Sequence, residues 1–394
     1  MINAEKYFAN RVKTLEGSAI RAIFKLLEQG NVISLAGGSP APESFPAQEL
    51  AEISKEILTE KPHIALQYSV TEGYTPLREL LKKRMAEKFN SFKCETDDLI
   101  VTCGAQQGID LAMKVLINEG DIIAVEEPSF IGTLNSARSY GAVLKGVPVD
   151  EDGMNMEKLE QLLKSENVKL IYTISTFQNP SGITMSLEKR KKLIELAEKY
   201  DVLILEDNPY GELRFRGEAV PTIKSLDKDG RVLYAGTFSK ILSAGMRLGW
   251  ICAEKNLLAR IIVVKQVNDV HTPILTQMMA YEYMSRYSID EHIAKISRLY
   301  EKKCDAMLEA MDKYLAGKCT YTRPEGGIFL QCTMPEGADT KALLEKATKN
   351  GVAFVPGNSF MVDMSKPANT FRLNYSLVPQ DNIETAIRLL AEVM

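Results

Sequence analysis

The sequence predicts an α/β protein with a mostly parallel, buried central sheet and a smaller α+β domain after it. Up to about residue 290, short β-rich runs alternate with helical patterns, which is typical of parallel strands connected by helices. Beyond that point a long amphipathic helical pattern comes first, and weaker strands and further helices follow. At 394 residues the chain is long enough for one large domain and a smaller one.

The elements follow from these patterns in chain order. Six β-rich runs predict strands at 99–103, 122–126, 170–175, 202–206, 232–236 and 248–253. Helical periodicity between them predicts helices that include 108–118, 156–164 and 187–200. The later part is predicted to contain a long helix at 291–314, strands at 327–332, 352–355 and 370–375, and helices at 341–350 and 382–393.

Composition excludes several classes of protein. A net charge of −4 argues against a nucleic-acid partner. Six scattered cysteines predict free thiols in a reducing compartment, and three histidines without ligand spacing argue against a metal site or a Ser-His-Asp triad. No apolar run is long enough to span a membrane, and residues 1–17 lack the apolar core of a signal peptide. We therefore expect a cytoplasmic protein without membrane or nucleic-acid partners.

One lysine stands out because of its neighbours. Lys240 follows the predicted strand 232–236, Thr237 and Ser239 precede it, and Arg247 comes seven residues later. A desolvated lysine amine attacks carbonyl groups, while hydroxyls and a guanidinium suit a phosphate. This combination suits pyridoxal 5′-phosphate (PLP), which has both an aldehyde and a phosphate. The alternative is an ordinary solvated loop lysine.

Polar residues also follow other predicted strands, where ligands bind in an open α/β sheet. The sequence GAQQG at 104–108 opens a helix, so the backbone amides of Ala105 and Gln106 could bind an anion. A plain strand-to-helix turn would explain the same residues.

Three more strand ends contain residues that fit a PLP ring. Asp207 could keep the pyridine nitrogen protonated, Asn179 and Tyr210 could contact the phenolic oxygen, and Phe130 could stack on the ring. Turn signals explain the first three positions equally well, and an aromatic residue after a strand is usually core. Together with Lys240, however, all of them have one ligand in common.

Seven segments in order resemble the fold-type I PLP enzymes of class I/II aminotransferases. The branch that holds 2-aminoadipate, kynurenine and broad aromatic aminotransferases is the most similar. The segments are SLAGGSPAP at 34–42, LQYSVTEG at 66–73, the loop at 104, NPSG at 179–182, DNPY at 207–210, the lysine segment at 237–247, and FRLNYS at 371–376. The resemblance spans nearly the whole chain. It implies a mostly parallel, seven-stranded central sheet flanked by helices. Residues 1–47 would form an N-terminal arm and part of the small domain, 48–288 the large PLP-binding domain, and 289–394 the C-terminal small domain.

The resemblance also implies a role for each matching residue toward PLP. Lys240, Asp207 and Tyr210 would be catalytic, with Lys240 bound to the cofactor aldehyde and later moving a proton. The residues implied to bind the cofactor are Ala105, Gln106, Phe130, Asn179, Asp207, Tyr210, Thr237, Ser239, Lys240, Arg247 and Tyr68. Tyr68 would reach the cofactor phosphate of a neighbouring subunit, which implies a homodimer.

The substrate would be bound by a second set. Arg372 would clamp the α-carboxylate as a bidentate fork, for which a lysine is a poor replacement. Gly38 would approach the substrate through its backbone, and Asn179 and Tyr68 would also contact it. Arg21 is the candidate for the distal carboxylate of an acidic substrate, although a solvated arginine flanking an apolar helix face would give the same pattern.

Two positions depart from the family pattern. Ala244-Gly245 stands where Pro-Gly is common, and Phe130 stands where Tyr is common. The implied activity is transfer of an amino group between an L-amino acid (2-aminoadipate, an aromatic or a large apolar one) and a 2-oxo acid, usually 2-oxoglutarate, by a ping-pong mechanism. A C–S β-lyase on the same scaffold is an alternative. An effector-binding domain of a transcription regulator is a weaker one, because only 31 residues precede the core pattern.

Overall fold

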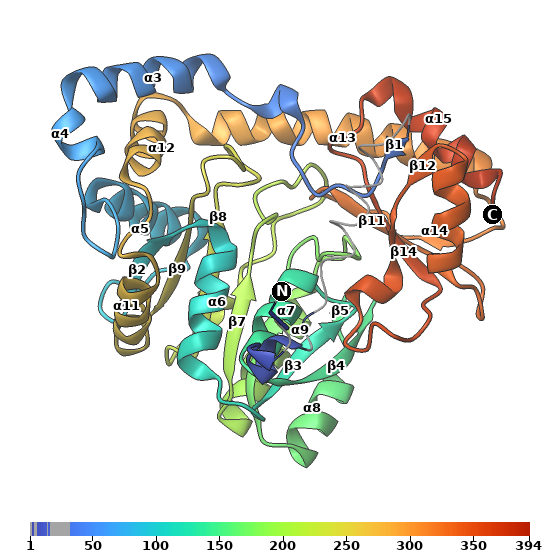
Figure 1. Cartoon of the computed structure of the whole chain (residues 1–394), viewed down its shortest axis with the longest axis horizontal. Coiled ribbons are helices and arrows are strands. Elements are labelled where there is room, and N and C mark those ends of the chain that lie inside the picture. The colour runs from blue at the N-terminus through green and yellow to red at the C-terminus, as the bar shows by residue number, and fades with distance from the viewer. Residues whose placement is uncertain (1, 4–5, 14, 16–31) are drawn as a thin grey trace.

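The computed structural model describes residues 2–3, 6–13, 15 and 32–394, and its centre is a large sheet (Figure 1). The strands of this sheet are β2 (Asp97–Thr102), β3 (Ile122–Glu127), β4 (Val143–Asp150), β5 (Gly153–Met154), β6 (Val168–Thr173), β7 (Leu203–Asp207), β8 (Val232–Thr237) and β9 (Gly249–Glu254). Their order is β2-β9-β8-β7-β6-β3-β4-β5. Only β9 and β5 run against the others. The sheet is therefore mostly parallel, as predicted, and the two-residue β5 extends the expected seven strands at one edge.

All six strands predicted for this sheet exist, with bounds that differ by at most two residues. Strand β4 was not predicted, because it lies next to the edge of the sheet, is partly exposed, and has an apolar pattern that Lys145, Pro148 and Asp150 interrupt.

Helices cover both faces of the sheet. The helices of this part of the chain are α3 (Ala47–Glu60), α4 (Pro62–Ala65), α5 (Thr75–Phe89), α6 (Gly104–Leu116), α7 (Ile131–Ser139), α8 (Met156–Ser165), α9 (Leu187–Tyr200), α10 (Ile223–Leu226), α11 (Lys255–Asp269) and α12 (Ile274–Arg286). Apolar residues of α8 and α9 pack with the strand residues that face one side of the sheet. Those of α6 and α7 pack with the alternate strand residues, which face the other side. Helix α6 begins four residues before its predicted start, because the Gln107 side chain accepts a hydrogen bond from the Cys103 amide (2.7 Å) and closes the first turn.

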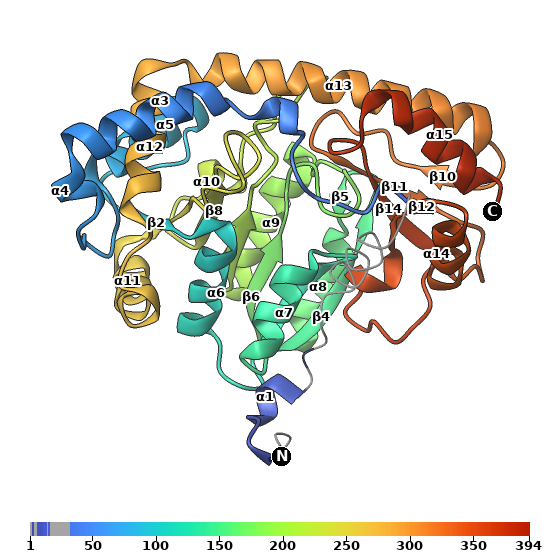
Figure 2. The same ribbon diagram turned by 45° about the horizontal axis from the view of Figure 1, so that its top comes forward.

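The second part of the fold contains a four-stranded antiparallel sheet. Its strands in order are β10 (Thr320–Tyr321), β11 (Phe329–Thr333), β14 (Thr370–Asn374) and β13 (Val355–Pro356), and α14 (Thr340–Lys349), α15 (Gln380–Ala391) and η3 (Gly357–Phe360) accompany it. Helix α13 (Ile289–Tyr314) runs from α12 along the molecule and packs on α15 (Figure 2). The predicted long helix is confirmed.

The single strand predicted at 352–355 is wrong. The chain changes sheets at the buried Phe354: β12 (Val352–Ala353) pairs in parallel with β1 (Ile33–Ser34), whereas β13 pairs with β14. Two short elements complete the described chain, α1 (Asn10–Lys13) and η2 (Pro42–Ser44). Within the described residues, none of the helices combines the length and the apolar character needed to cross a bilayer.

Candidate active site

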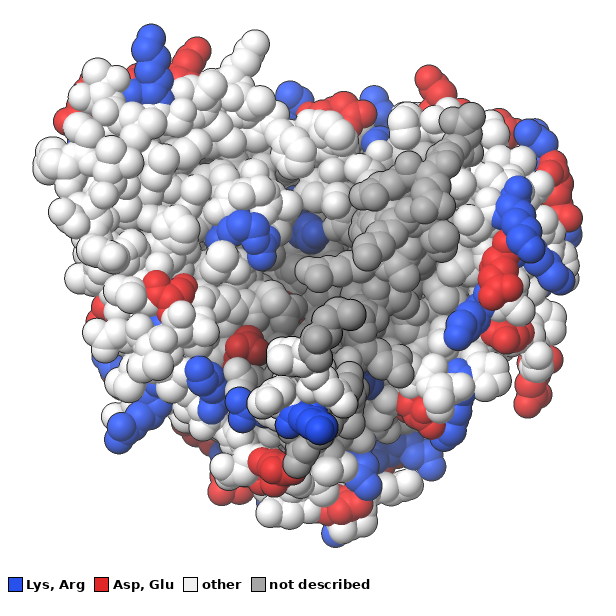
Figure 3. Space-filling model, in the orientation of Figure 1, with Lys and Arg blue, Asp and Glu red and all other residues white. Residues whose placement is uncertain are grey.

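A cavity of about 260 Å³ lies where the carboxyl ends of β2, β3, β6, β7 and β8 meet. All predicted site residues except Tyr68 and Arg21 line it. They are Gly38, Ala105, Gln106, Phe130, Asn179, Asp207, Tyr210, Thr237, Ser239, Lys240, Arg247 and Arg372. The face drawn in Figure 3 is hollowed near its centre, and Lys and Arg side chains (blue) reach the hollow. The sequence therefore predicted the residues that converge, although they are far apart along the chain.

Lys240 lies in the turn after β8, and its Nζ donates a hydrogen bond to the carbonyl oxygen of Gly38 (2.6 Å). Burial lowers the pKa of the Lys240 amine to about 8, and the positive charges of Arg372 and Arg247 act in the same direction. A substantial fraction of this amine is therefore neutral near pH 8, the form that attacks a carbonyl group or accepts a proton.

The end of the cavity at α6 is built to bind an anion. The first amides of α6 have no acceptor within the helix, and Gly104 has a φ of +74° that brings its backbone against Arg247. A Cβ on Gly249 would lie 2.5 Å from the amide nitrogen of Ala105, so only glycine leaves this amide accessible.

Side chains complete that anion site. The Thr237 hydroxyl lies 3.0 Å from the Ser239 hydroxyl, and among the described residues the exposed Arg247 guanidinium makes only contacts of 3.2 and 3.5 Å to backbone carbonyls. The Gln106 side chain donates instead to the Gly132 carbonyl and the Ser136 hydroxyl. Gln106 can therefore contribute through its backbone amide, as the sequence analysis expected. Amides, two hydroxyls and a guanidinium suit a phosphate dianion.

Asp207 ends β7 and is buried beneath the cavity. The hydroxyl of Tyr172 donates to its Oδ2 (2.8 Å), whereas Oδ1 is buried without a hydrogen-bond partner among the described residues. Burial raises the pKa of the Asp207 carboxyl to about 7. A buried carboxylate oxygen without a partner is costly, so Asp207 fits a cationic N–H donor such as the pyridinium of PLP.

Arg372 reaches the cavity from β14, in the second part of the fold. It donates to Asn179 Oδ1 (2.8 Å) and to the Ala36 carbonyl (2.7 Å), while its Nε has no partner within the described chain. Its guanidinium lies 4.0 Å from the ring centroid of Phe329 and 5.0 Å from that of Phe360. Burial lowers the pKa of Arg372 to about 10, so it stays cationic near neutral pH.

Four residues that line the cavity were not predicted. They are Ile109, Ile174, Pro209 and Phe329. The ring of Phe329 lies edge-on to that of Tyr210 at 5.7 Å. An apolar residue at the start of a strand gives no signal that separates it from the core, so sequence patterns alone could not single it out.

Two predicted residues lie elsewhere. Tyr68 is 81% exposed, outside the cavity of its own chain, with its ring edge-on to His271 at 5.9 Å. Arg21 is outside the described residues.

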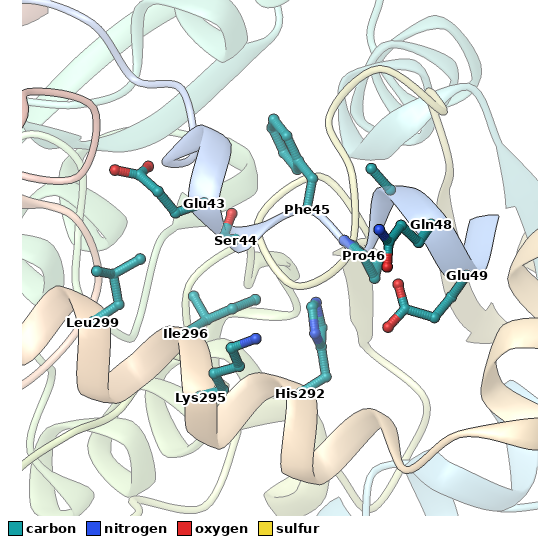
Figure 4. Close-up of a pocket in the computed structure, with 11 residues that line it drawn as sticks. Glu43, Ser44, Phe45, Pro46, Gln48, Glu49, His292, Lys295, Ile296 and Leu299 are labelled. Carbon is teal, nitrogen blue, oxygen red and sulfur yellow. The ribbon is translucent and has the colours of Figure 1, made fainter. Parts of the chain in front are cut away.

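A second cavity, of about 420 Å³, lies between residues 43–49 and α13 (Figure 4). His292, Lys295, Ile296 and Leu299 reach it from α13. The two cavities have no lining residue in common among those the structure describes. The second one combines scattered charges of both signs rather than an amine, a buried carboxylate and a guanidinium around one space, so the Lys240 cavity is the candidate active site.

The fold and this cavity fit a PLP-dependent enzyme: Lys240 would face the aldehyde, Asp207 the pyridine nitrogen and the start of α6 the phosphate. Comparison with known proteins agrees. The chain belongs to the family aminotransferase class I and II, whose model matches residues 30–390.

Relatives of known activity extend over the whole chain. It is 44% identical to aromatic-amino-acid aminotransferase 1 of Thermococcus litoralis, over 100% of this chain and 95% of that protein. The structure matches Pyrococcus horikoshii kynurenine aminotransferase in complex with PMP (TM-score 0.95, 40% identity, 99% of this chain and 97% of that one). It also matches LysN, the α-aminoadipate aminotransferase of Thermus thermophilus, complexed with N-(5′-phosphopyridoxyl)-L-leucine (TM-score 0.92, 34% identity, 100% and 98%). The chain is a PLP-dependent transaminase.

The buried Asp207 carboxylate predicts how the stability of the cofactor-free protein depends on pH. The folded-state pKa of Asp207, about 7, lies above the ordinary 3.8. The contribution of this carboxyl group to the free energy of unfolding is therefore fully present below about pH 4 and is lost as pH rises through about 7. Asp207→Asn replaces the carboxyl group by a neutral amide of the same size and shape. We expect it to stabilise the cofactor-free protein by up to about 4 kcal/mol at pH 8, the equivalent of about three pKa units, and by little at pH 4.5.

Urea unfolding at both pH values, at one protein concentration, checks this prediction. Asp381→Asn removes an exposed carboxylate and is the matched control. Equal stability of Asp207→Asn and the wild-type protein at pH 8 would contradict the prediction, because it would show that other interactions offset the free-energy cost of burying the carboxylate.

Proposed function

We propose that this transaminase exchanges the amino group of an L-amino acid (2-aminoadipate, an aromatic or a large apolar one) with a 2-oxo acid, usually 2-oxoglutarate. The observation that supports the proposal is the convergence of the Lys240 amine, the Asp207 carboxylate and the Arg372 guanidinium on one cavity. Apolar residues between them, Ile109 and Phe329 among them, suit aromatic and apolar side chains. The names of the relatives, which act on aromatic amino acids, kynurenine and α-aminoadipate, point to the same range.

The residues divide the chemistry between them. When bound, PLP supplies an aldehyde and a ring that accepts electron density from the substrate Cα. Asp207 holds a proton at the pyridine nitrogen, which keeps the ring electron-poor. Arg372 orients the substrate by its α-carboxylate. Lys240 Nζ, partly neutral near pH 8, takes the proton from the substrate Cα as a general base. As a general acid it returns the proton at the aldehyde carbon of the cofactor.

A single carboxylate clamp favours a ping-pong sequence. Every amino acid and every 2-oxo acid has the α-carboxylate that Arg372 would bind, so the amino donor and the oxo acceptor would use one site in turn. Double-reciprocal plots of the initial rate against one substrate, at several fixed concentrations of the other, should then be parallel.

A panel of amino donors tests the proposal and its substrate range. We expect 2-aminoadipate, kynurenine, phenylalanine and leucine to yield glutamate from 2-oxoglutarate. If Arg21 binds a distal carboxylate, Arg21→Ala should raise KM for 2-aminoadipate and 2-oxoglutarate by about tenfold, the size of one lost charged hydrogen bond, and change that for leucine little. Equal effects on all donors would remove Arg21 from substrate recognition.

The same panel separates transamination from β-elimination. If amino transfer is the main reaction of the enzyme, incubation with cystathionine should release little pyruvate. Pyruvate release faster than glutamate formation from any donor would favour a C–S β-lyase instead.

We also propose a homodimer in which Tyr68 reaches the neighbouring active site. Tyr68 belongs to a strip of exposed apolar residues, an unusual feature for a surface that faces water. The strip contains Leu66, Tyr68 and Val70 together with Val267 and Val270 at the end of α11, and the contact between Tyr68 and His271 joins the two segments.

Subunit mixing tests the shared site. Tyr68→Ala should weaken PLP binding by about 10- to 100-fold, the size of a hydrogen bond to a charged group, without dissociating the dimer. Mixing Tyr68→Ala with Lys240→Ala subunits should restore activity, because the mixed dimer contains one complete site. A wild-type protein that sediments as a monomer with full PLP affinity would contradict the proposal.

The cytoplasm is the proposed location. All six cysteines are free thiols in the structure, which suits a reducing compartment.

A further inference from the structure

A tyrosine behind the cavity makes the hydrogen bond that orients Asp207. Tyr172 lies on β6, beside β7, and pairs with Leu205 two residues before Asp207. Alternate residues of a strand face the same side, so Tyr172, Leu205 and Asp207 share one face of the sheet. The Tyr172 hydroxyl donates to Asp207 Oδ2 at 2.8 Å, and both residues are buried.

This bond gives the two carboxylate oxygens of Asp207 different surroundings. Oδ2 is held by Tyr172, whereas Oδ1 has no hydrogen-bond partner among the described residues. Asp207 lines the cavity and Tyr172 does not. The hydrogen bond to Asp207 is therefore the contact through which the Tyr172 hydroxyl would act on the chemistry.

The surroundings make Tyr172 the group that favours the ionised form of Asp207. Burial raises the pKa of the Asp207 carboxyl and the negative charge of Glu206 raises it further, while the hydrogen bond from Tyr172 lowers it. Burial and the charges of Asp207 and Glu126 keep the pKa of Tyr172 well above 10, so its hydroxyl stays a donor at any working pH. Glu126 and Glu206 are themselves held by other donors: Thr173 and Gln178 for Glu126, Ser175 and backbone amides of 223–224 for Glu206.

We propose that Tyr172 is a positioning residue: its hydroxyl fixes Asp207 Oδ2 so that Oδ1 stays free and turned toward the pyridine nitrogen of the cofactor. The inference rests on the proposed role of Asp207. Without the hydroxyl, the Asp207 side chain loses its charge-assisted hydrogen bond, rotates about its last torsion and becomes harder to ionise. A phenylalanine in place of Tyr172 preserves the packing between β6 and its neighbours.

Tyr172→Phe tests the proposal without relying on turnover alone. PLP titrated into the cofactor-free protein should bind about tenfold more weakly than to wild type, the size of one lost charged hydrogen bond. The acidic limb of the pH profile of PLP binding should move to higher pH, because the pKa of Asp207 rises. KM for the amino donor should stay unchanged, since Arg372 is untouched.

Two further variants separate positioning from packing. Tyr300→Phe, on α13, removes another buried tyrosine hydroxyl, one that accepts a hydrogen bond from the Ala41 amide (3.1 Å). This variant should leave PLP affinity and the pH profile unchanged. In an Asp207→Asn background, Tyr172→Phe should cause no further loss of PLP affinity.

Each contrary outcome identifies what fails. If Asp207→Asn weakens PLP binding while Tyr172→Phe changes neither affinity nor pH profile, the positioning role is overturned and the proposed function stands. A tenfold loss by Tyr172→Phe in both backgrounds would show that Tyr172 acts by packing, which also overturns it. If Asp207→Asn itself leaves PLP affinity and turnover unchanged, the role proposed for Asp207 fails, and the inference fails with it.

Discussion

Lys240→Ala is expected to lower the rate of amino transfer more than any other single change. General-base catalysis alone contributes about 10²–10⁴-fold, and the covalent bond to the cofactor aldehyde is lost as well, so kcat should fall by at least that factor. The visible absorbance of lysine-bound PLP should disappear. PLP itself should still bind, because Thr237, Ser239, Arg247 and the amides of α6 would hold the phosphate independently of Lys240.

Single-turnover measurements with an amino donor, followed by absorbance, check this result. Lys228→Ala removes an exposed lysine from the segment before β8 and is the matched control. A Lys240→Ala protein that kept the lysine-bound absorbance would move the covalent role to another amine. Normal single-turnover rates in that variant would remove Lys240 from proton transfer.

The catalytic set could be predicted from the sequence because of a property of parallel sheets. Asn179, Asp207 and Lys240 each follow a predicted strand, and carboxyl ends of parallel strands meet at one edge. Their convergence therefore follows from strand order alone, without knowledge of the packing. The exact start of α6 did not follow in this way, because it depends on the Gln107 side chain reaching back to Cys103.

What surrounds the catalytic set was less accessible. Tyr172 has the residue type and position of an ordinary core residue of β6, and only its contact with Asp207 distinguishes it. Phe329 and Phe360 flank Arg372 from separate elements of the C-terminal part, so their arrangement depends on tertiary packing. The change of sheet at Phe354 arises because β1, about 320 residues earlier in the chain, pairs with β12. In each case long-range contacts rather than local pattern decide the structure.

Arg372 is the second position where a large effect is expected, and Arg372→Lys is the more informative variant. Lysine keeps the positive charge but has no planar fork, and it cannot stack between two rings as the guanidinium does with Phe329 and Phe360. In its proposed role, Arg372 would donate two charge-assisted hydrogen bonds to the substrate carboxylate, at about 1.5–3 kcal/mol each. We expect kcat/KM to fall by about 10²-fold or more for every amino donor, because each has the same α-carboxylate.

The uniformity of that loss is the decisive measurement. Arg214→Lys is a matched control, since Arg214 stacks on the Phe177 ring (4.7 Å) outside the cavity and pairs with Glu325. PLP affinity should be unaffected in both variants, because among the described residues Arg372 bonds to Asn179 and Ala36 and not to the residues of the anion site. A loss confined to acidic donors would assign Arg372 to the distal carboxylate rather than the α-carboxylate, and the α-carboxylate would then need another cation of the site.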